Sequence, residues 1–367
     1  MPDPAPTYWD YLKLDQLLSL QGGLEEHDGQ VEPDELHFII VHQAFELWFK
    51  LVLRELRLAR DYLAAPRVAE EAIPHVVHHL GRVNEIFRLL VDQFAIMETL
   101  TPQDFLAFRD KLVPASGFQS FQMREIELVL GLEDAQRVVE GGLDPMRTLE
   151  RMARQSPGGA GAWAKIDAAR RETTLLDGLR RWLHRTPIQG SSPGDPGDED
   201  AVDAFLADYL ARLEGTGEVA ATKLKEIPGT DAAETDRRIA AGQSQARTFL
   251  LALDRPEAER ARVKRTRAGL VFVESYRRLP LLAWPRLLID TVVELEEQLV
   301  LWRTRHARMV ERVIGRRVGT GGSSGVDYLD QTARYRIFGE LWTVRTLLLP
   351  RDDLPALQRP ELYGFAV

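Results

Sequence analysis

The sequence predicts an all-α protein. Apolar residues recur three or four positions apart over long runs of the 367-residue chain, which is the spacing that places them on one face of a helix. Strict alternation of apolar and polar residues, which is typical of a half-buried strand, is hard to find over any window of strand length. Residues that favour helix ends stand where several of the runs begin and stop. We therefore expect helices to build nearly the whole chain.

The predicted helices follow one another along the chain. They cover residues 34–64, 67–97, 101–112, 121–131, 162–184, 202–211 and 285–315. The third helix has a clear start, because Thr101 suits an N-cap, Pro102 suits the first turn, and Asp104 is the acid expected just beyond. The last helix has a clear end, because Gly315 follows a turn that contains Arg312, and basic residues suit a helix C-terminus.

Two stretches interrupt the helical pattern. Residues 156–161 are rich in glycine, and residues 187–200 are rich in Gly, Pro, Ser and Asp, which predicts a mobile acidic loop. Residues 200–268 return to helical spacing with much surface charge. We interpret residues 1–367 as a single domain, a large helical bundle in which 187–268 form a peripheral helical insertion. A separate domain is the alternative interpretation of that insertion.

Composition excludes several classes of site and partner. The chain has no cysteine, so disulfides, thiolate-held zinc or iron–sulfur clusters and a cysteine nucleophile are excluded, and any metal must be held by histidine or carboxylate. A net charge of -9 argues against nucleic acid and anionic membranes as partners. No run of eighteen apolar residues occurs, and residues 1–10 lack the pattern of a targeting signal. We expect a cytoplasmic protein that binds neither nucleic acid nor membrane.

His306 is the first candidate metal ligand. On the predicted helix it shares a face with Leu299, Trp302, Met309, Val310 and Val313. A histidine in such an apolar stripe is more often a hydrogen-bonded core residue than a ligand. A haem pocket nevertheless requires this arrangement, because apolar side chains around one axial nitrogen keep bulk water away from the iron.

His42 lies on a second face of this kind. Phe38, Phe45 and Phe49 stand three or four residues away from it or from one another, so one imidazole is surrounded by aromatic rings. Such a face would suit a flat aromatic ligand with one N–H group, because the rings pack against its body and a ring nitrogen accepts the hydrogen bond. The alternative is a core helix whose histidine bonds a backbone carbonyl.

Arg109 emerges from the apolar side of its predicted helix, four residues after Phe105. Most helical arginines are solvated, but one on an apolar face requires an anion, and a substrate carboxylate is a natural bidentate partner in a dry cleft.

Two small-residue segments lie further along the chain: PASGFQS at residues 114–120, and GTGGSSG at residues 319–325. The second is either a plain flexible linker or a loop that folds over a ligand near the metal.

His75, His78 and His79 form a cluster beside Glu70 and Glu71. The spacing of three and four would allow a divalent ion to bind on one helix face, but a solvated surface is the more common outcome for such clusters.

The order of these features resembles the tryptophan 2,3-dioxygenase family. Four stretches carry the resemblance: TYWDYLKLDQLLSLQ at 7–21, DELHFIIVHQAFELWFK at 34–50, FRDKLVPASGFQSFQMREIE at 108–127, and LWRTRHARMVERVIGRRVGTGGSSG at 301–325. They cover about a fifth of the chain and are specific to the family. Residues from about 132 to 287 match poorly.

The resemblance implies a role for each matching residue in the cofactor and indole pocket. His306 matches the proximal ligand of the haem iron, and His42 matches the distal histidine that hydrogen-bonds the indole N–H. Phe38 and Phe105 match aromatic walls of the pocket. Phe105 stands where some members carry tyrosine, which removes one hydroxyl from this chain.

The resemblance also implies how the rest of the substrate is held. Arg109 matches the arginine that clamps the carboxylate, and Thr320 matches the threonine that contacts the α-ammonium group beside a haem propionate. Ser116 matches a pocket serine on the distal side. Tyr8, Tyr11 and Leu12 match N-terminal residues that reach into the pocket of a neighbouring subunit. Residues 1–30 are therefore expected to form an arm in a homotetramer built as a dimer of dimers.

The activity implied is cleavage of the indole C2–C3 bond of L-tryptophan by O2, with haem b as cofactor and N-formyl-L-kynurenine as product. This is the first step of tryptophan catabolism through kynurenine. One alternative is a related haem enzyme, a monooxygenase or dioxygenase, that acts on a substituted tryptophan in a biosynthetic pathway. Another is a haem-containing sensor without turnover, although merely holding haem requires neither Arg109 nor the 319–325 loop.

Overall fold

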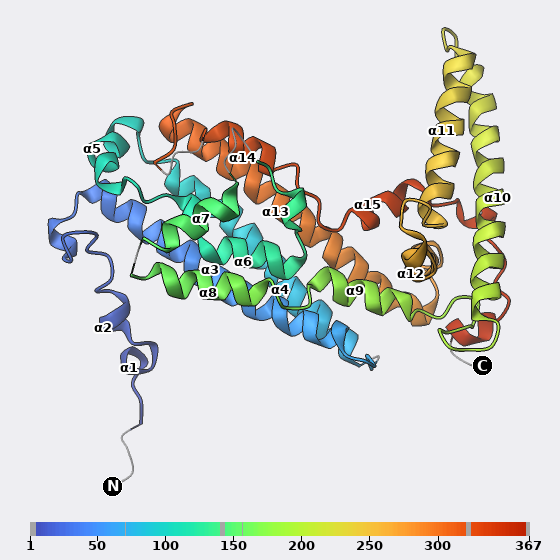
Figure 1. Ribbon diagram of the computed structural model, residues 1–367, viewed down its shortest axis with the longest axis horizontal. Helices are drawn as coiled ribbons and strands as arrows, with labels where there is room; N and C mark the ends of the chain where they lie inside the picture. The colour runs from blue at the N-terminus through green and yellow to red at the C-terminus, as the bar shows by residue number, and fades with distance from the viewer. Residues whose placement is uncertain (1–4, 70, 140–143, 156, 321–323, 365–367) are drawn as a thin grey trace. The chain divides into compact units, whose positions relative to one another are not determined.

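The fold is built from helices, as the sequence predicts. The structure, a computed structural model, describes residues 5–69, 71–139, 144–155, 157–320 and 324–364 (Figure 1). Within these ranges the backbone forms α-helices, short 3-10 turns and loops, and β-type pairing is limited to an isolated bridge between Ile188 and Ser191. The all-α prediction is confirmed.

The α-helices are α1 (Tyr8–Leu12), α2 (Leu14–Leu17), α3 (Pro33–Ala64), α4 (Ala72–Met97), α5 (Pro102–Leu112), α6 (Phe121–Leu130), α7 (Pro145–Ala153), α8 (Gly159–Ala169), α9 (Leu175–His184), α10 (Asp198–Lys225), α11 (Ala232–Leu250), α12 (Glu257–Ser275), α13 (Ala283–Ile314), α14 (Val326–Thr332) and α15 (Gly339–Thr346). A 3-10 turn, η2 (Gly117–Gln119), lies between α5 and α6.

Helix ends follow the predicted signals in two places. The hydroxyl of Thr101 caps α5 by accepting a hydrogen bond from the backbone N–H of Asp104, and Pro102 opens the helix. Gly315 ends α13 with a φ of 62°, and its N–H donates to Glu311 O at 2.9 Å. That left-handed conformation is accessible to glycine without a side-chain clash, so the helix stops there.

Several predicted boundaries differ from the structure, and the helix expected over 67–97 begins only at Ala72 as α4. The helix expected over 162–184 is two helices, α8 and α9, because Thr174 and Asp177 form a reciprocal capping box that starts α9. The glycine-rich break expected at 156–161 ends early, since α8 begins at Gly159. The helix expected over 202–211 is the longer α10, which is followed by α11 and α12 in the same charged region.

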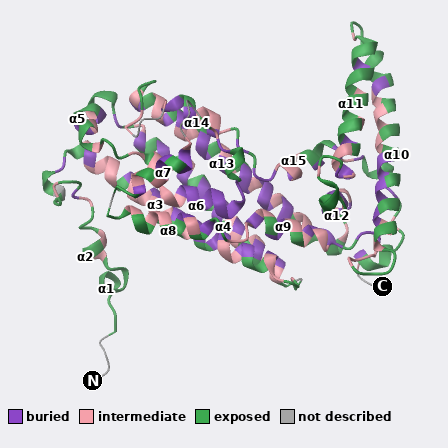
Figure 2. Cartoon of the chain, in the orientation of Figure 1, coloured by how far each residue is buried: buried purple, intermediate pink, exposed green. Residues whose placement is uncertain are grey.

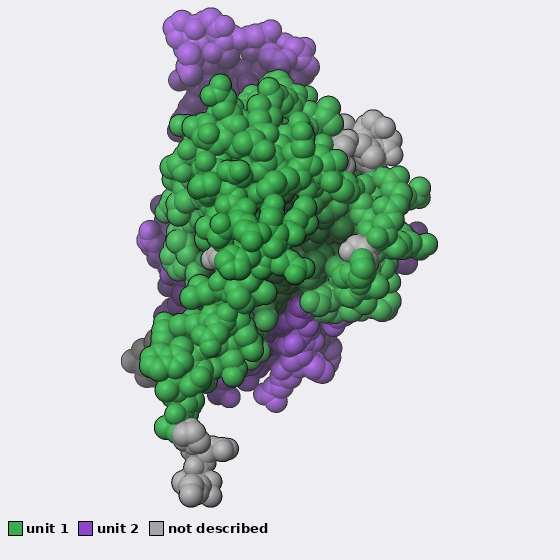
Figure 3. Space-filling view, turned by 90° about the vertical axis from the view of Figure 1, so that its left-hand side faces the viewer, with its two compact units in different colours: residues 1–55, 82–172, 297–335 green, residues 56–81, 173–296, 336–367 purple. Residues whose placement is uncertain are grey.

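The chain divides into two compact units. Unit 1 contains residues 1–55, 82–172 and 297–335, and unit 2 contains residues 56–81, 173–296 and 336–367 (Figure 3). Helices α3, α4 and α13 each contribute residues to both units. The division into a single domain with a peripheral insertion at 187–268 stays a prediction.

The core of unit 1 is formed by facing sides of α3, α4, α6 and α13 (Figure 2). Phe45 and Phe49 on α3 are buried, and the ring of Phe45 lies 5.0 Å from that of Phe94 on α4. Phe49 packs edge-on against Trp302 of α13 at 5.9 Å between ring centroids. The aromatic residues that the sequence places at helical spacing therefore meet in one layer of rings, and burial of their apolar surface stabilises the unit.

Helix α3 also has the length and composition of a membrane-spanning segment. An 18-residue window within it has a mean hydropathy of 1.4, and among the described residues it is the one helix to reach this level. Core helices have the same composition, and α3 supplies buried Val41, Phe45 and Phe49 to unit 1.

In unit 2 the stretch predicted to be a mobile acidic loop is anchored. The side chain of Gln189 is buried, donates to Ala356 O at 3.0 Å and accepts from Gln358 N at 2.8 Å. Asp198, at the start of α10, pairs with Arg265 of α12 at 2.9 Å. The composition of residues 187–200 predicted mobility, and this prediction was wrong because the anchoring partners lie far away in sequence. Most of the α10–α11 hairpin beyond this loop is exposed (Figure 2).

Candidate active site

A cavity of about 240 Å³ lies within unit 1. Residues from α3, α4, α5, α6, α13 and α14 line it, together with the segments that follow α5 and α13. Seven of the ten site residues predicted from the sequence line this cavity: Phe38, His42, Phe105, Arg109, Ser116, His306 and Thr320. The chain thus brings together side chains that are up to 282 positions apart in sequence, counting from Phe38 to Thr320.

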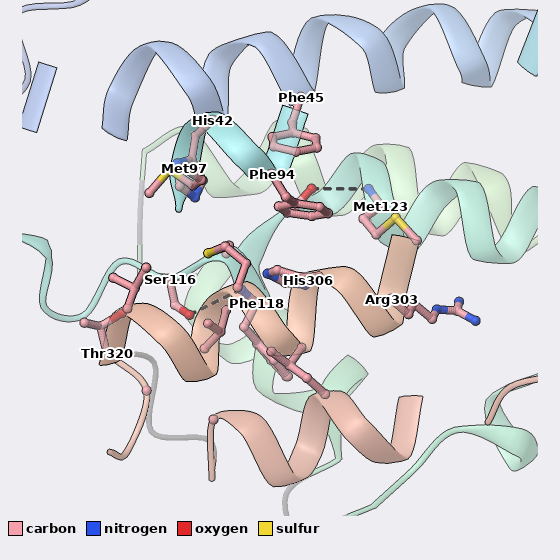
Figure 4. A pocket seen from close by; sticks show the side chains of 18 of the residues that line it. His42, Phe45, Phe94, Met97, Ser116, Phe118, Met123, Arg303, His306 and Thr320 are labelled. Carbon is pink, nitrogen blue, oxygen red and sulfur yellow. Dashed lines mark hydrogen bonds between the residues drawn. The ribbon is translucent and has the colours of Figure 1, made fainter. Parts of the chain in front are cut away.

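His306 reaches the cavity from α13 (Figure 4). Trp302, Met309, Val310 and Val313, which the helical pattern places on the same face, also line it. The ring of Phe94 stacks on the imidazole at 5.5 Å with an angle of 10° between the planes. Burial lowers the pKa of His306 to about 4, and the proximity of His42 and Arg124 adds to this effect. The imidazole is therefore neutral at pH 7, as metal ligation requires.

His42 reaches the same cavity from α3 (Figure 4). Its Nδ1 atom lies 2.8 Å from the carbonyl oxygen of Phe38, one helical turn earlier, so Nδ1–H donates to that oxygen. Burial lowers the pKa of His42, which keeps the ring neutral. With Nδ1 carrying the proton, Nε2 is a hydrogen-bond acceptor. The backbone bond that the sequence suggested as the alternative to ligand binding instead fixes the tautomer that can accept from a ligand.

Aromatic rings of α3 and α5 surround His42. The ring of Phe38 packs against the imidazole at 3.9 Å and lies 6.0 Å from that of Phe105. Phe108, which is fully buried, lies 5.6 Å from Phe38 and holds it in place. Together these tilted and edge-on rings form an apolar wall beside the Nε2 acceptor of His42.

Arg109 extends from α5 toward the segment that follows α13. Its Nη2 donates to Val318 O at 2.7 Å. Its Nε is buried and has no hydrogen-bond partner among the described residues. A guanidinium with an unused buried donor is suited to bind an anion, because the anion would satisfy both its charge and its N–H group.

The two hydroxyl groups predicted for the site are bonded to backbone. Ser116 caps η2, and its Oγ accepts from Phe118 N at 3.3 Å. Thr320 Oγ1 donates to Ala115 O at 2.6 Å, which ties the segment after α13 to the segment after α5. Three residues of the predicted 319–325 loop, Gly321, Gly322 and Ser323, lie outside the described residues.

Sequence reasoning missed a buried charge cluster at the cavity wall. Glu127, which is 2 % exposed, pairs with Arg124 at 2.9 Å, with Arg137 at 2.5 Å and with Arg303 at 3.0 Å. Burial acts to raise the pKa of Glu127, but the three guanidiniums outweigh it and lower the pKa to about 2. The wall therefore carries more positive than negative charge. The pairing of Glu127 with Arg303 spans 176 positions, and no local pattern signals it.

Two further polar groups of the cavity wall have no partner. Trp302 Nε1 and Tyr328 Oη are buried and make no hydrogen bond among the described residues. Leaving a buried donor unpaired is costly, and such groups are rare in folded proteins. Their presence in a cavity indicates that something else bonds them when the cavity is filled.

Metal binding by the chain's residues alone is not supported elsewhere. Among the described residues, no group of three or more His, Asp or Glu side chains is arranged to hold a metal ion. In the histidine cluster of α4, His75 and His79 instead stack on Tyr62 at 6.0 and 6.2 Å. The cavity offers single neutral imidazoles, so a metal held there would bring its remaining ligands with it, as in a metalloporphyrin.

The other three predicted residues lie outside this cavity. Tyr8, Tyr11 and Leu12 lie on α1 and are 71 %, 77 % and 42 % exposed. They do not line the cavity of their own chain.

Comparison with known proteins identifies the family. The family model for tryptophan 2,3-dioxygenase matches residues 3–348. Tryptophan 2,3-dioxygenase of Sorangium cellulosum is 46 % identical over 98 % of this chain and 88 % of its own length. Tryptophan 2,3-dioxygenase 2 of Ralstonia nicotianae is 46 % identical over 98 % of both chains. A tryptophan 2,3-dioxygenase-like protein of Xanthomonas campestris is 49 % identical over 73 % of this chain and 98 % of its own length.

The resemblance expected from four segments therefore extends along almost the whole sequence, including residues 132–287, which the motifs did not cover. The chain belongs to the tryptophan 2,3-dioxygenase family.

Proposed function

We propose that the protein is a haem-dependent dioxygenase that cleaves the indole C2–C3 bond of L-tryptophan with O2 to give N-formyl-L-kynurenine. The observation that carries the proposal is the cavity of unit 1, where His42, Arg109 and His306 converge from three different helices. Membership of the family and the names of the relatives supply the substrate and the reaction type.

Haem b fits the cavity by its chemistry. His306 offers a neutral imidazole among apolar side chains, which is the setting of an axial ligand. The unpaired donors Trp302 Nε1 and Tyr328 Oη suit a cofactor whose edge carries carboxylates. When bound, haem supplies the iron at which O2 is activated.

The substrate is held at both ends by residues of α3 and α5. Arg109 binds the carboxylate with donors that lack an acidic partner in the chain's own hydrogen bonds. His42 accepts a hydrogen bond from the indole N–H at Nε2, and Phe38 and Phe105 pack on the indole ring. Held at two points, the C2–C3 bond has a fixed orientation, which is the main contribution of these residues to the rate.

The remaining predicted residues complete the pocket. Thr320 contacts the α-ammonium group of the substrate, and Ser116 is a serine on the distal side of the pocket. Thr320 lines the cavity and its hydroxyl donates to Ala115 O, so the segment after α13 is tied to the segment after α5 beside the substrate.

The assembly is a homotetramer in which α1 of one subunit completes the pocket of another. The exposed side chains of Tyr8, Trp9, Tyr11 and Leu12 on α1 support this, since neighbouring exposed apolar residues often mark a site of protein–protein contact. Residues 1–30 form the arm that makes this contact. We place the protein in the cytoplasm, in tryptophan catabolism through kynurenine.

Product mass tests the proposal directly. Purified protein loaded with haem and reduced is incubated with L-tryptophan and 18O2, and the product is analysed by mass spectrometry. We expect N-formyl-L-kynurenine that carries two labelled oxygen atoms. One labelled atom would instead indicate the related monooxygenase, and no turnover would contradict an enzymatic role.

A further inference from the structure

Lys111 links α5 and α3, which line the cavity, to the segment between α2 and α3. It lies in the last turn of α5, and its Nζ donates to Glu25 Oε1 at 2.8 Å and to Glu35 Oε2 at 3.0 Å. Glu25 belongs to the segment between α2 and α3, and Glu35 lies in the first turn of α3. One ammonium group therefore bridges two helices and the base of the N-terminal arm.

The two bridged helices hold the two ends of the proposed substrate. Lys111 follows Arg109 by two residues on α5. Glu35 precedes His42 by seven residues on α3, which is two helical turns along the same face. Glu35 itself is 2 % exposed, so its carboxylate is fixed in the packing of α3. The Lys111–Glu35 bond is thus a direct polar link between the element that carries Arg109 and the element that carries His42.

Ring contacts also join α5 to the start of α3. Phe38 meets Phe105 at 6.0 Å and Phe108 at 5.6 Å. Ring contacts of this kind bury area, but they tolerate sliding, since the attraction between apolar surfaces is not directional. The Lys111–Glu35 ion pair adds one charged hydrogen bond of defined length between the two helices, which restricts the position of one helix along the other.

The arm base packs against the same charged group. Gly23 adopts a φ of +58°, and a Cβ added there would lie 3.4 Å from Glu35 Oε1 and from Ile39 Cδ1. Gln21 Nε2 donates to Gln43 Oε1 at 2.7 Å, and Gln43 is the residue next to His42. The hydrogen bonds with Glu25 and Glu35 raise the pKa of Lys111, so the bridge stays charged through the neutral range.

We propose that Lys111 is a positioning residue for tryptophan, which sets the spacing between Arg109 on α5 and His42 on α3 through its bonds to Glu35 and Glu25. This inference rests on the proposed function, because it assumes that one substrate is held by both residues. Tryptophan is a rigid ring with a short side chain, so an error in the spacing weakens one of its two polar contacts.

The test compares two ligands to distinguish a changed spacing between Arg109 and His42 from general damage to the pocket. Lys111→Met removes the charge and keeps the aliphatic stem, Lys111→Arg restores a donor, and Lys264→Met removes a comparable lysine, paired with Asp203 in unit 2, as the matched control. Each haem-loaded protein is assayed for kcat and KM with L-tryptophan. The inhibition constant of 3-methylindole, which has neither carboxylate nor ammonium group, is measured in the same assay.

In Lys111→Met we expect KM for tryptophan to rise about tenfold with kcat within about twofold, because ground-state and transition-state binding lose the same contact. The inhibition constant of 3-methylindole should stay within about twofold, since that ligand does not use Arg109. Lys111→Arg should recover most of the KM change, and Lys264→Met should match the wild type.

Loss of Lys111 leaves the buried carboxylate of Glu35 without its ion-pair partner, which by itself disturbs α3. The double variant Lys111→Met with Glu35→Gln therefore removes the unpaired carboxylate. It should keep the raised KM while its thermal unfolding midpoint returns toward that of the wild type.

An unchanged KM in Lys111→Met, or equal rises in the KM for tryptophan and the inhibition constant for 3-methylindole, would overturn the positioning role. A wild type that does not turn over tryptophan would overturn the proposed function and this inference with it. Because the wild type is measured in the same series, the two failures are distinguishable.

Discussion

Two arginines, one in each unit, show how the same side chain is used for folding and for binding. Arg267 of unit 2 is 2 % exposed, donates twice to Asp254 at 2.6 and 2.9 Å, once to Glu340 at 2.9 Å and once to Phe249 O at 2.7 Å. Arg109 of unit 1 donates to the backbone oxygen of Val318 and leaves a buried Nε unpaired.

The difference lies in whether the chain supplies its own acceptors. Where it does, as around Arg267, the guanidinium joins elements of the fold, and its loss is expected to lower stability. Where the described residues supply no acceptor, as for Arg109 Nε, Trp302 Nε1 and Tyr328 Oη, the unpaired donor belongs to a residue that lines the cavity. Such a donor is available to bind a ligand. Loss of such a group should affect binding more than folding.

The largest expected effect separates the two histidines of the cavity. His306→Ala should abolish haem retention, because it removes the axial ligand, whereas His42→Ala should retain haem and lose much of the activity. Absorption spectra of the purified variants measure haem content. His184→Ala in unit 2 serves as the control and should retain both. Equal haem loss in His306→Ala and His42→Ala would contradict the two assignments.

Loss of Arg109 should change substrate binding, whereas loss of Arg267 should change stability. Arg109→Met is expected to raise KM for tryptophan about 30-fold or more, since truncating a charged contact costs at least ~2 kcal/mol, with little change in the unfolding midpoint. Arg267→Met should lower the free energy of unfolding by about 3 kcal/mol and leave KM unchanged wherever the protein is folded. Kinetics and thermal unfolding of both variants check this. A large stability loss in Arg109→Met would mean that Arg109 belongs to the fold.

Acid should reveal the buried carboxylate of the cavity wall. Burial alone would raise the pKa of Glu127, but three arginines lower it from 4.5 to about 2. Its contribution to the free energy of unfolding is therefore complete above pH 4.5 and is lost as the pH falls through about 2. The loss is on the order of 3 kcal/mol.

Denaturant unfolding at a series of pH values from neutral to acid measures the slope of the free energy of unfolding against pH. Glu127→Gln should flatten it, and Arg137→Met, which removes one of the three partners, should move the steep region to higher pH. Glu234→Gln removes an exposed carboxylate paired with Arg237 and is the matched control, with a slope like that of the wild type. A wild-type slope in Glu127→Gln would contradict the account.

Local patterns predicted much of this molecule. The cap at Thr101, the glycine that ends α13 and the apolar stripe around His306 depend on residues within a few positions of one another, and each is present in the structure. The seven cavity residues were assigned their roles by resemblance, and the folding of α3, α5, α13 and the segments that follow α5 and α13 brings them to one cavity.

Long-range partners were not predictable in the same way. Arg109 bonds Val318 across 209 positions, and Glu127 bonds Arg303 across 176. The loop at 187–200 was expected from its composition to be mobile, but its anchors, Ala356 and Gln358, lie near the other end of the chain, where no local pattern reveals them. Polar residues that look solvated in sequence become structural when a distant element supplies the acceptor.

The smallest expected effect compares two buried tyrosines. Tyr276 of unit 2 donates to Pro355 O at 2.6 Å, whereas Tyr328 of unit 1 has no partner for its hydroxyl among the described residues. Tyr276→Phe should lower the free energy of unfolding by about 1 kcal/mol, because it leaves a buried carbonyl without its donor. Tyr328→Phe should leave the haem-free protein as stable or raise its stability by up to about 1 kcal/mol, because it removes a buried unpaired group.

Bound haem should reverse the direction of the stability change in Tyr328→Phe but not in Tyr276→Phe. If its hydroxyl bonds the cofactor, Tyr328→Phe should weaken haem retention and reduce the stabilisation that haem confers, since that stabilisation increases with the logarithm of the ligand's affinity. Unfolding midpoints with and without haem measure this for both variants. The same loss in Tyr328→Phe with and without haem would show that its hydroxyl bonds the protein itself, and the cavity's unpaired donors would then cease to mark a cofactor site.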